Sequence, residues 1–396
     1  MRNIFEDKCG ALSQRRAGLS LNQENPGALT IVHTEASVGW GGQEIRILQE
    51  ARWLRGRGHR VLLLAPGQSE ILRRGKEDGF ETEVFAFEKR TQWMDFFRLA
   101  SAFKRLKPDV VGTHSSVDSW AGLLAARMAR VPVALRYRHV SAPVHSHMMN
   151  KFLYRRCSDH VLTTAECIRT ELVRNLGVPE AKITTVPTGI EPPKFERSRE
   201  EARGEICRKL GLEESARFIG CVAVLRNWKG QEYLMSAFDS IAKEFPEHRL
   251  LLVGEGPGRP RLEKYRDGLA AKDRILLVGH QNDPWLFFRG MDAAVLPSYK
   301  DEGIPQSLLQ AMFAECPVLG ATTGGIPEIV IDGETGLLFP PKTIPELAVA
   351  LAATLRDTQK RGRRVQKALE FVRSRHTLDQ MGEAVLSIIE KVRRSK

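Results

Sequence analysis

An acidic side chain and a helix start stand together at 297–317, which reads PSYKDEGIPQSLLQAMFAECP. The apolar residues just before this stretch suit a buried parallel strand, and Pro305 stands where the first turn of a helix tolerates proline. Free N–H groups at a helix start attract phosphate, while the acid beside them, Glu302, can accept hydrogen bonds from sugar hydroxyls. A sugar joined through a diphosphate to a ribose fits this arrangement, running past Ser307 and Leu308 to Gln310.

A second loop between a strand and a helix carries two cations. In VLRNWKG, Arg226 and Lys229 follow an apolar run and precede a helical pattern. Two cations at such a point would neutralise a diphosphate, and an arginine can hold phosphate oxygens in a fork. Ordinary surface charge is the alternative interpretation of the same two residues.

Histidines and arginines follow two apolar runs in the first half of the chain. His114 ends the run DVVGTH, and VPVALRYRH ends at Arg138 and His139. In open α/β sheets the ligand crevice lies outside the carboxyl ends of the strands, so His139 is placed to face it. Arg136 and Arg138 beside it, with His114, are candidates to meet an acceptor phosphate. A purely structural histidine is the alternative for His139.

Elements that would position these residues repeat through both halves of the chain. Each half alternates β-rich runs with helical patterns, which predicts an α/β protein made of two facing doubly wound domains. Gly41 and Gly42 stand where the first strand gives way to a helix, and glycine there lets backbone approach a ligand closely. The predicted segments are a leader at 1–27, a first domain at 28–190, a polar linker at 191–216, a second domain at 217–365 and a C-terminal helix at 366–396.

Charge is unevenly distributed along the 396 residues, whose net formal charge is +12. Residues 96–158 alone hold 11 basic and 2 acidic side chains. Such an excess indicates an anionic partner, and nucleic acid, lipid headgroups and a phosphorylated sugar acceptor all remain open, as does a solvated basic face. The aromatic and basic helix predicted at 91–109 suits a membrane surface or packing on its own sheet.

Cysteine spacing and hydropathy argue against several other classes. The six cysteines include no C-x-x-C pair, so we expect neither a zinc site nor a disulfide framework, and we predict no bound metal. No apolar run is long enough to cross a bilayer, and the leader lacks the apolar core of a signal peptide. We therefore expect a cytoplasmic protein.

The segment EGIPQSLLQAM resembles the E-x7-E region of retaining glycosyltransferases of family 4, which have the GT-B fold. Glu302 matches the first acid, and Gln310 replaces the second, which in the family usually holds the nucleotide ribose. An amide can still bind a diol, but without charge. VLRNWKG resembles the segment whose Arg and Lys hold the donor phosphates, which implies that role for Arg226 and Lys229.

Other segments extend the resemblance over about 30–385. It implies that Gly41 and Gly42, with Glu44, lie at the interdomain cleft, and that His139 contacts the transferred sugar. It places Gly254 at the pocket for the nucleobase and His280 with Gln281 at the edge of the base. Gly325 matches a GG-x-x-E turn, in which Glu328 is either structural or sugar-facing. The C-terminal helix is expected to cross back to the first domain.

These observations together predict a transferase that uses a nucleotide-diphosphate sugar as donor substrate and needs no cofactor. Its acceptor would be a lipid-linked or lipopolysaccharide-type glycan, reached by peripheral contact with the inner face of the cell membrane. Catalysis would rest on His139, Glu302, Arg226 and Lys229. A sugar-nucleotide epimerase of the same fold and a non-catalytic sugar-nucleotide binder are the alternatives. A nucleic-acid-binding protein has only charge in its favour, with no recognisable binding module.

Overall fold

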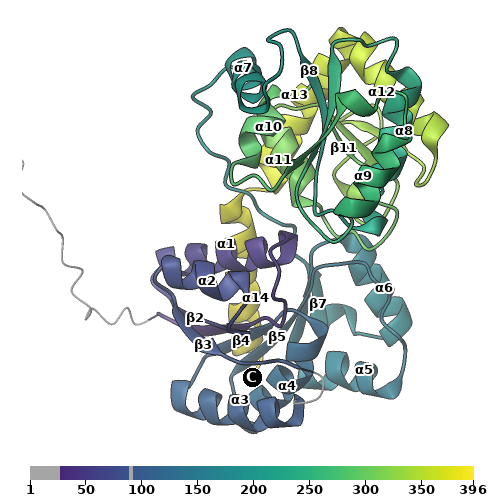
Figure 1. Cartoon of the computed structure of the whole chain (residues 1–396). Helices are drawn as coiled ribbons and strands as arrows, with labels where there is room; N and C mark the ends of the chain where they lie inside the picture. The colour runs from purple at the N-terminus through teal and green to yellow at the C-terminus, as the bar shows by residue number, and fades with distance from the viewer. Residues whose placement is uncertain (1–26, 89–91) are drawn as a thin grey trace, which may run out of the picture.

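The computed structural model describes residues 27–88 and 92–396, which form two α/β domains joined by two crossings of the chain (Figure 1). Each domain is built on one parallel sheet with helices packed against it, seven strands in the first and six in the second. This arrangement confirms the predicted pair of doubly wound domains. The predicted leader lies outside the described residues, apart from its last residue.

The first domain has the strand order β3-β2-β1-β4-β5-β6-β7, with every neighbouring pair parallel. The central strands of its sheet are buried on both faces, which explains why β2 and β4 read as nearly continuous apolar runs. Its strands are β1 (Thr30–Thr34), β2 (Arg60–Ala65), β3 (Glu81–Val84), β4 (Val110–Thr113), β5 (Val133–Arg138), β6 (His160–Thr163) and β7 (Ile183–Thr185). Its helices are α1 (Gly42–Gly56), α2 (Glu70–Glu77), α3 (Gln92–Leu106), α4 (Ser116–Met128), α5 (Met148–Phe152), η1 (Leu153–Cys157), α6 (Glu166–Leu176) and η2 (Glu180–Lys182).

The second domain has the strand order β10-β9-β8-β11-β12-β13, again all parallel. Its strands are β8 (Arg217–Val222), β9 (His248–Val253), β10 (Ile275–Gly279), β11 (Ala293–Leu296), β12 (Val318–Ala321) and β13 (Leu337–Phe339). Its helices are α7 (Arg199–Leu210), η3 (Asn227–Lys229), α8 (Gln231–Ile241), α9 (Arg259–Asp267), η4 (Lys272–Arg274), α10 (Pro284–Gly290), α11 (Gln306–Phe313), η5 (Ile326–Glu328), α12 (Ile344–Arg356) and α13 (Thr358–Arg375).

The predicted linker at 191–216 is wrong over its second half, because residues 199–210 form α7 and pack on α10. Ala202, Ile206 and Cys207 of α7 are buried in the core of the second domain. The polar side chains that suggest a linker lie around a narrow apolar stripe, which is enough to bury a helix on one side.

The C-terminal helix that crosses to the first domain is α14 (Leu378–Arg394), which packs on α1 and begins later than the predicted 366 (Figure 1). The preceding helix, α13, belongs to the second domain through buried Ala368 and Val372. The indole Nε1 of Trp53 donates to the Asp379 carboxylate at 2.7 Å, and Gly382 leaves room for the same indole.

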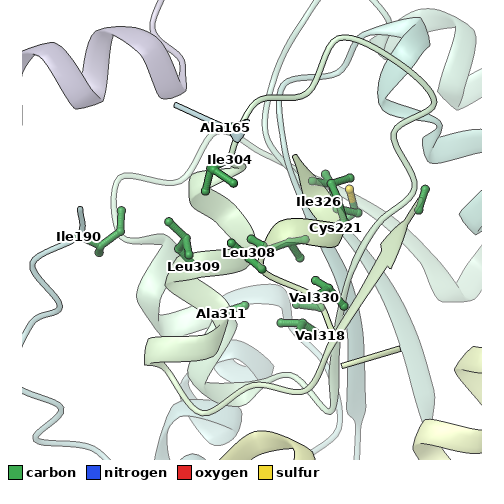
Figure 2. Packing of buried hydrophobic residues seen from close by; sticks show 14 of the residues in the cluster. Ala165, Ile190, Cys221, Ile304, Leu308, Leu309, Ala311, Val318, Ile326 and Val330 are labelled. Carbon is green, nitrogen blue, oxygen red and sulfur yellow. The ribbon is translucent and has the colours of Figure 1, made fainter. Parts of the chain in front are cut away.

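Buried apolar side chains hold α11 against the second sheet and reach into the first domain (Figure 2). Leu308, Leu309 and Ala311 are at most 2% exposed. In the same apolar cluster lie Ala165 and Ile190 of the first domain. The start of α11 is therefore fixed by packing on both domains.

Candidate active site

Both sheets reverse their strand order at a point where predicted site residues lie. In the first sheet β1 and β4 are neighbours, and in the second β8 and β11 are neighbours, so consecutive crossovers leave in opposite directions at each place. The loops that follow these strands enclose the crevice in which open α/β sheets bind ligands. Arg226 and Lys229 follow β8, whereas Glu302 follows β11. A hydrogen bond from the Tyr299 N–H to the Trp228 carbonyl at 2.9 Å joins the two loops.

Lys229 and Glu302 form an ion pair at the junction of these two loops. The Lys229 Nζ donates to the Glu302 carboxylate at 2.5 Å, and both side chains are largely buried. The same ammonium lies 4.4 Å from the centre of the Trp228 ring. The pair thus places a cation that can bind phosphate next to an acid that can accept a hydrogen bond from a hydroxyl.

Arg226 is exposed, and its guanidinium has no partner among the described residues. The glycine turn that follows β9 packs closely against the backbone of the loop that carries Arg226. A Cβ on Gly254 would lie 2.1 Å from the Ala223 carbonyl oxygen, and one on Gly256 would lie 2.5 Å from that of Leu225. Both glycines also have φ values of at least 141°. Gly254 therefore shapes the Arg226 loop, because no larger residue fits there.

The first turn of α11 presents unpaired backbone donors beside Glu302. Among the described residues no partner is found for the N–H groups of Gln306, Ser307 and Leu308. Pro305 is the residue before the helix and has an extended ψ of 117°. The prediction that it belongs to the first turn of the helix is therefore wrong. The Leu308 side chain is buried in the core, so its N–H is the group that can meet a ligand. Gln310 is half-buried, and its amide has no partner in the described part of the chain.

Backbone of the second domain lies directly against the carboxyl end of the first sheet. A Cβ on Gly303 would lie 2.1 Å from the His139 carbonyl oxygen, and one on Gly325 would lie 3.0 Å from the Ala165 Cβ. The Gly325 N–H donates to the Glu302 carbonyl at 3.2 Å. Gly325 therefore braces the acidic loop while allowing the two domains to touch.

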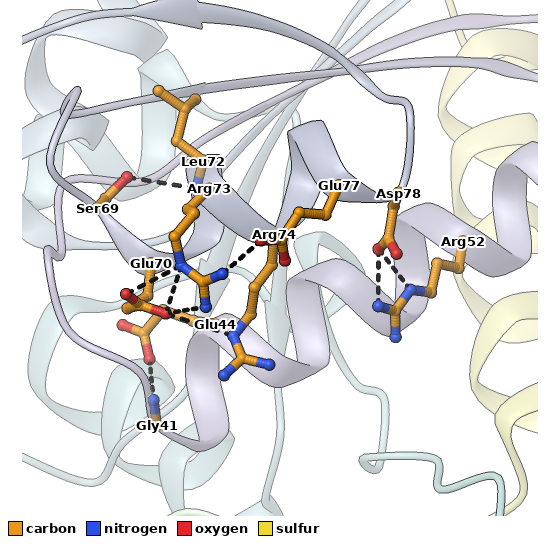
Figure 3. A network of polar contacts seen from close by, with 10 residues as sticks. All are labelled: Gly41, Glu44, Arg52, Ser69, Glu70, Leu72, Arg73, Arg74, Glu77 and Asp78. Atoms are coloured by element: carbon orange, nitrogen blue, oxygen red, sulfur yellow. Dashed lines mark hydrogen bonds and ion pairs between the residues drawn. The ribbon is translucent and has the colours of Figure 1, made fainter. Parts of the chain in front are cut away.

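The glycine loop of the first domain is held by its own acid and reaches the second domain. Figure 3 shows the Gly41 N–H donating to the Glu44 carboxylate, at 2.8 Å. The Gly42 carbonyl accepts a hydrogen bond of 2.6 Å from the Gln306 amide at the start of α11. Burial, with Asp118 and Glu44 nearby, raises the pKa of Glu35 behind this loop to about 8. The loop of Gly41 and Gly42, which is predicted to lie at the interdomain cleft, thus contacts the start of α11 in the second domain.

His139 lies in the contact between the domains, whereas two of its predicted companions, His114 and Arg136, are more deeply buried. The Thr164 hydroxyl donates to the His139 carbonyl at 3.0 Å, and the His139 ring contacts His114. Arg136 is 1% exposed and donates to the carbonyls of Thr113 and Tyr137. Arg136 and buried His114 are therefore internal groups in this structure, and their role at an acceptor stays a prediction.

Two further predicted site residues, Arg138 and His280, lie at the carboxyl ends of β5 and β10. Arg138 is partly buried and donates to the Ala142 carbonyl. His280 is exposed after β10, and the carbonyl of the preceding Gly279 accepts from the Gly254 N–H at 2.9 Å. The strand end predicted to meet the nucleobase is thus joined to the glycine turn that supports the Arg226 loop.

Gln306 and Glu328 make interdomain contacts that the sequence does not predict, although the family resemblance leaves Glu328 as either structural or sugar-facing. Glu328 accepts hydrogen bonds from the N–H groups of Glu166 and Cys167, at 2.8 and 2.9 Å, and so caps α6 of the other domain. No local pattern reveals this, because an N-cap is normally sought within a few residues of its helix. Gln306 stands beside a proline at a helix start, where its type carries no signal for a contact 264 residues away.

Replacing Glu328 with glutamine should lower the free energy of unfolding by about 1–2 kcal/mol, since a charged acceptor at a helix start is lost. Urea unfolding followed by circular dichroism measures the change. Glu370→Gln, at an exposed position on α13, is the matched control and should change it by less than about 0.5 kcal/mol. Equal midpoints for the two variants would show that the interdomain cap contributes nothing.

A polar cavity of about 700 Å³ lies elsewhere, at the amino ends of the second sheet's strands. It is lined by Arg203, Arg217, His248 and Asp292, among others, and Arg203 and Asp292 form a buried ion pair of 2.9 Å. None of the predicted site residues lines this cavity. This cavity is therefore separate from the candidate active site.

Comparison with known proteins gives matches to both domains. The model for glycosyl transferases group 1 matches residues 202–371, and that for glycosyltransferase family 4 matches residues 40–193. The chain is 24% identical to the D-inositol 3-phosphate glycosyltransferase of Corynebacterium efficiens over 84% of this chain and 87% of that enzyme. It is 26% identical to the alpha-D-kanosaminyltransferase of Streptomyces kanamyceticus, over 59% of this chain and 60% of that enzyme's length.

Solved structures show the same fold. A glycosyltransferase from Rickettsia africae superposes with a TM-score of 0.81 at 18% identity, covering 92% of this chain and 99% of that one. Anabaena HepE in complex with UDP-glucose superposes with a TM-score of 0.80 at 19% identity, covering 92% and 100%. Two family models that between them match both domains, and the two sheets with their facing carboxyl ends, lead to one conclusion. The chain belongs to the family 4 glycosyltransferases and has the GT-B fold.

Proposed function

We propose that this protein transfers a sugar from a nucleotide-diphosphate donor to a glycan or lipid-linked acceptor, with retention at the anomeric carbon. The observation that carries the proposal is the buried Lys229–Glu302 pair beside the N–H groups of α11 that have no partner among the described residues, on a loop whose Gly303 lies against the His139 carbonyl. A cation, an anion-binding helix start and an acid within one pair of adjoining loops match the chemistry of a sugar diphosphate.

Stabilisation of the leaving diphosphate is the main catalytic effect we expect from this arrangement. Arg226, Lys229 and the helix start would neutralise the charge that develops as the bond between sugar and phosphate breaks. Glu302 and His139 would orient the sugar from either side. Because side-chain cations supply the positive charge, we expect chelation by EDTA to leave the rate unchanged.

The donor side has support from related proteins. HepE, which shares this fold, has been crystallised with UDP and with UDP-glucose. Thermal shift of the protein with a panel of sugar nucleotides should single out one donor. NMR of the anomeric proton during transfer to a lipid-linked glycan then reports the stereochemistry. Inversion would contradict retention. Isomerisation of the donor without acceptor would indicate an epimerase, and binding without turnover a non-catalytic binder.

Replacing Gln310 with glutamate should keep or strengthen nucleotide binding, because a carboxylate accepts hydrogen bonds from a ribose diol more strongly than an amide does. A gain of about 2–10-fold in affinity corresponds to one improved hydrogen bond. Calorimetry with the nucleoside diphosphate measures it, and Gln380→Glu, far from the site on α14, is the control. A large loss of affinity would show that the amide has its own role.

The acceptor side of the first domain exposes apolar side chains among basic ones. Trp93, Met94 and Phe97 of α3 are exposed, as are Met148 and Phe152 of α5, and both helices lie on the same side of the domain (Figure 1). Phe103 of α3 instead packs in the core, so core packing, one of the two alternatives for this helix, accounts for one of its faces and leaves the side chains of the other face exposed. No described helix is long and apolar enough to span a bilayer. We propose that this surface rests on anionic lipid.

Substituting aspartate for both Trp93 and Phe97 should therefore reduce binding to vesicles containing anionic phospholipid by at least about tenfold, since it removes two anchors and adds two repelled charges. Co-sedimentation measures bound protein. Val349→Asp, which alters an equally exposed apolar residue of the second domain, is the control. Unchanged binding of the double variant would remove this surface from the proposal.

A further inference from the structure

Three buried histidine rings form a continuous hydrogen-bonded chain that ends at the proposed sugar site. His33 Nδ1 lies 2.9 Å from His114 Nε2, and His114 Nδ1 lies 2.9 Å from His139 Nε2. The rings come from β1 and from the ends of β4 and β5, which are successive strands in the sheet. All three are at most 8% exposed. The two terminal nitrogens, His33 Nε2 and His139 Nδ1, are buried and unpartnered among the described residues.

Surrounding residues are arranged to hold these rings in place. The Tyr137 ring stacks on His114 with centroids 4.3 Å apart, and its hydroxyl donates to Glu50 at 2.6 Å. Gly112 in β4 leaves the necessary space, because a Cβ there would lie 3.1 Å from His33 Nδ1 and 3.0 Å from the Tyr137 ring. The chain of rings is therefore built into the sheet.

Hydrogen-bond chemistry leaves this chain two arrangements of protons. Burial lowers the pKa of each histidine, so the rings are neutral and each carries one N–H. A hydrogen bond between two imidazoles needs one protonated and one bare nitrogen. Either all three protons point from His139 toward His33, leaving His139 Nδ1 bare, or all three point the other way.

The position of His139 separates the two arrangements. Its backbone carbonyl lies against Gly303 of the second domain, so its unpartnered Nδ1 is the end of the chain nearest the proposed sugar site, where a bare nitrogen can accept from a hydroxyl. We propose that His33 and His114 are positioning residues that hold His139 with Nε2 protonated and Nδ1 bare, so that Nδ1 accepts a hydrogen bond from a hydroxyl of the bound sugar. The role of this hydroxyl rests on the proposed function, whereas the tautomer does not.

Ring nitrogen NMR on the full chain, labelled with ¹⁵N-histidine, tests the tautomer without any substrate. We expect His139 Nδ1 to give the shift of a bare nitrogen and Nε2 that of an N–H. In His114→Phe, which keeps an aromatic ring but removes both nitrogens, His139 should show a mixture of tautomers. His33→Phe acts two rings away and gives the same test if the first variant does not fold. His160→Phe, at a buried histidine of β6 that bonds Thr184 instead, should leave the His139 shifts unchanged.

Kinetics then connect the tautomer to catalysis. His114→Phe should lower kcat by about 2–10-fold, the contribution of one hydrogen bond, and His114→Gln should recover part of the loss because its amide can both donate and accept. A protonated His139 Nδ1 in the unaltered protein, or His139 shifts that do not respond to His114→Phe, would overturn the proposal. Correct shifts with no glycosyl transfer would instead count against the proposed function.

Discussion

Arg226→Ala and Lys229→Ala are each expected to lower kcat by about 10²–10³-fold, because each removes a preorganised charge aimed at the leaving diphosphate. Transfer of labelled sugar under donor saturation measures the effect. Lys264→Ala, at an exposed position on α9, is the control and should retain full activity. Unchanged turnover in both site variants would contradict the phosphate assignment.

Ion pairing makes the two substitutions differ in stability. Arg226 has no partner among the described residues, so its removal should leave the free energy of unfolding nearly unchanged. Removing Lys229 leaves the Glu302 carboxylate buried and unpaired, which costs up to about 3–5 kcal/mol. The double variant Lys229→Ala/Glu302→Gln should recover much of that stability and none of the activity. Recovered activity would mean that Lys229 acts only by neutralising Glu302.

Gly303→Ala is the second change with a large expected effect. Its methyl group would lie 2.1 Å from the His139 carbonyl oxygen and 2.6 Å from the Thr164 hydroxyl, which belong to the other domain. The methyl should push the domains apart by about 1 Å, and a displacement of that size can cost about 10²-fold in rate. The backbone of Gly303 is not in the left-handed region, so the second domain itself should fold normally.

Two measurements distinguish this displacement of the domains from unfolding of the protein. Activity should fall while the circular dichroism spectrum stays the same, and small-angle scattering should show a larger radius of gyration. Gly362→Ala adds a methyl group with nothing within 4 Å and serves as the control. Full activity in Gly303→Ala would show that the contact between Gly303 and His139 is not required for catalysis.

The loops after β8 and β11 show which part of the site can be predicted from residues that are close in sequence. Arg226, Lys229 and Glu302 could be predicted because each follows an apolar strand within a few residues, and parallel strands deliver their following loops to one edge. The order of α/β elements follows for the same reason, since hydrophobic periodicity is a short-range property. That order also predicts that the two halves form separate sheets, which the structure confirms.

Local patterns do not predict burial that depends on residues distant in sequence. Arg136 looks like an accessible cation at the end of a strand, yet α-helices cover both faces of its sheet and its guanidinium is satisfied by backbone carbonyls. The charged residues of α7 similarly conceal a stripe that becomes apolar core once α10 is beside it. Composition cannot show which face of an element its neighbours will cover.

By itself, the sequence determined the alternation of strands and helices, the loops that carry the phosphate-binding groups, and the acid beside a helix start, because these depend on neighbours a few residues apart. Only the tertiary structure decided that Glu328 caps a helix of the other domain, that Gln306 bonds the glycine loop, and that three histidines join into one chain. Those contacts link residues 25 to 264 positions apart. Their partners are chosen by how the two sheets pack, and no local pattern of residue types encodes that choice.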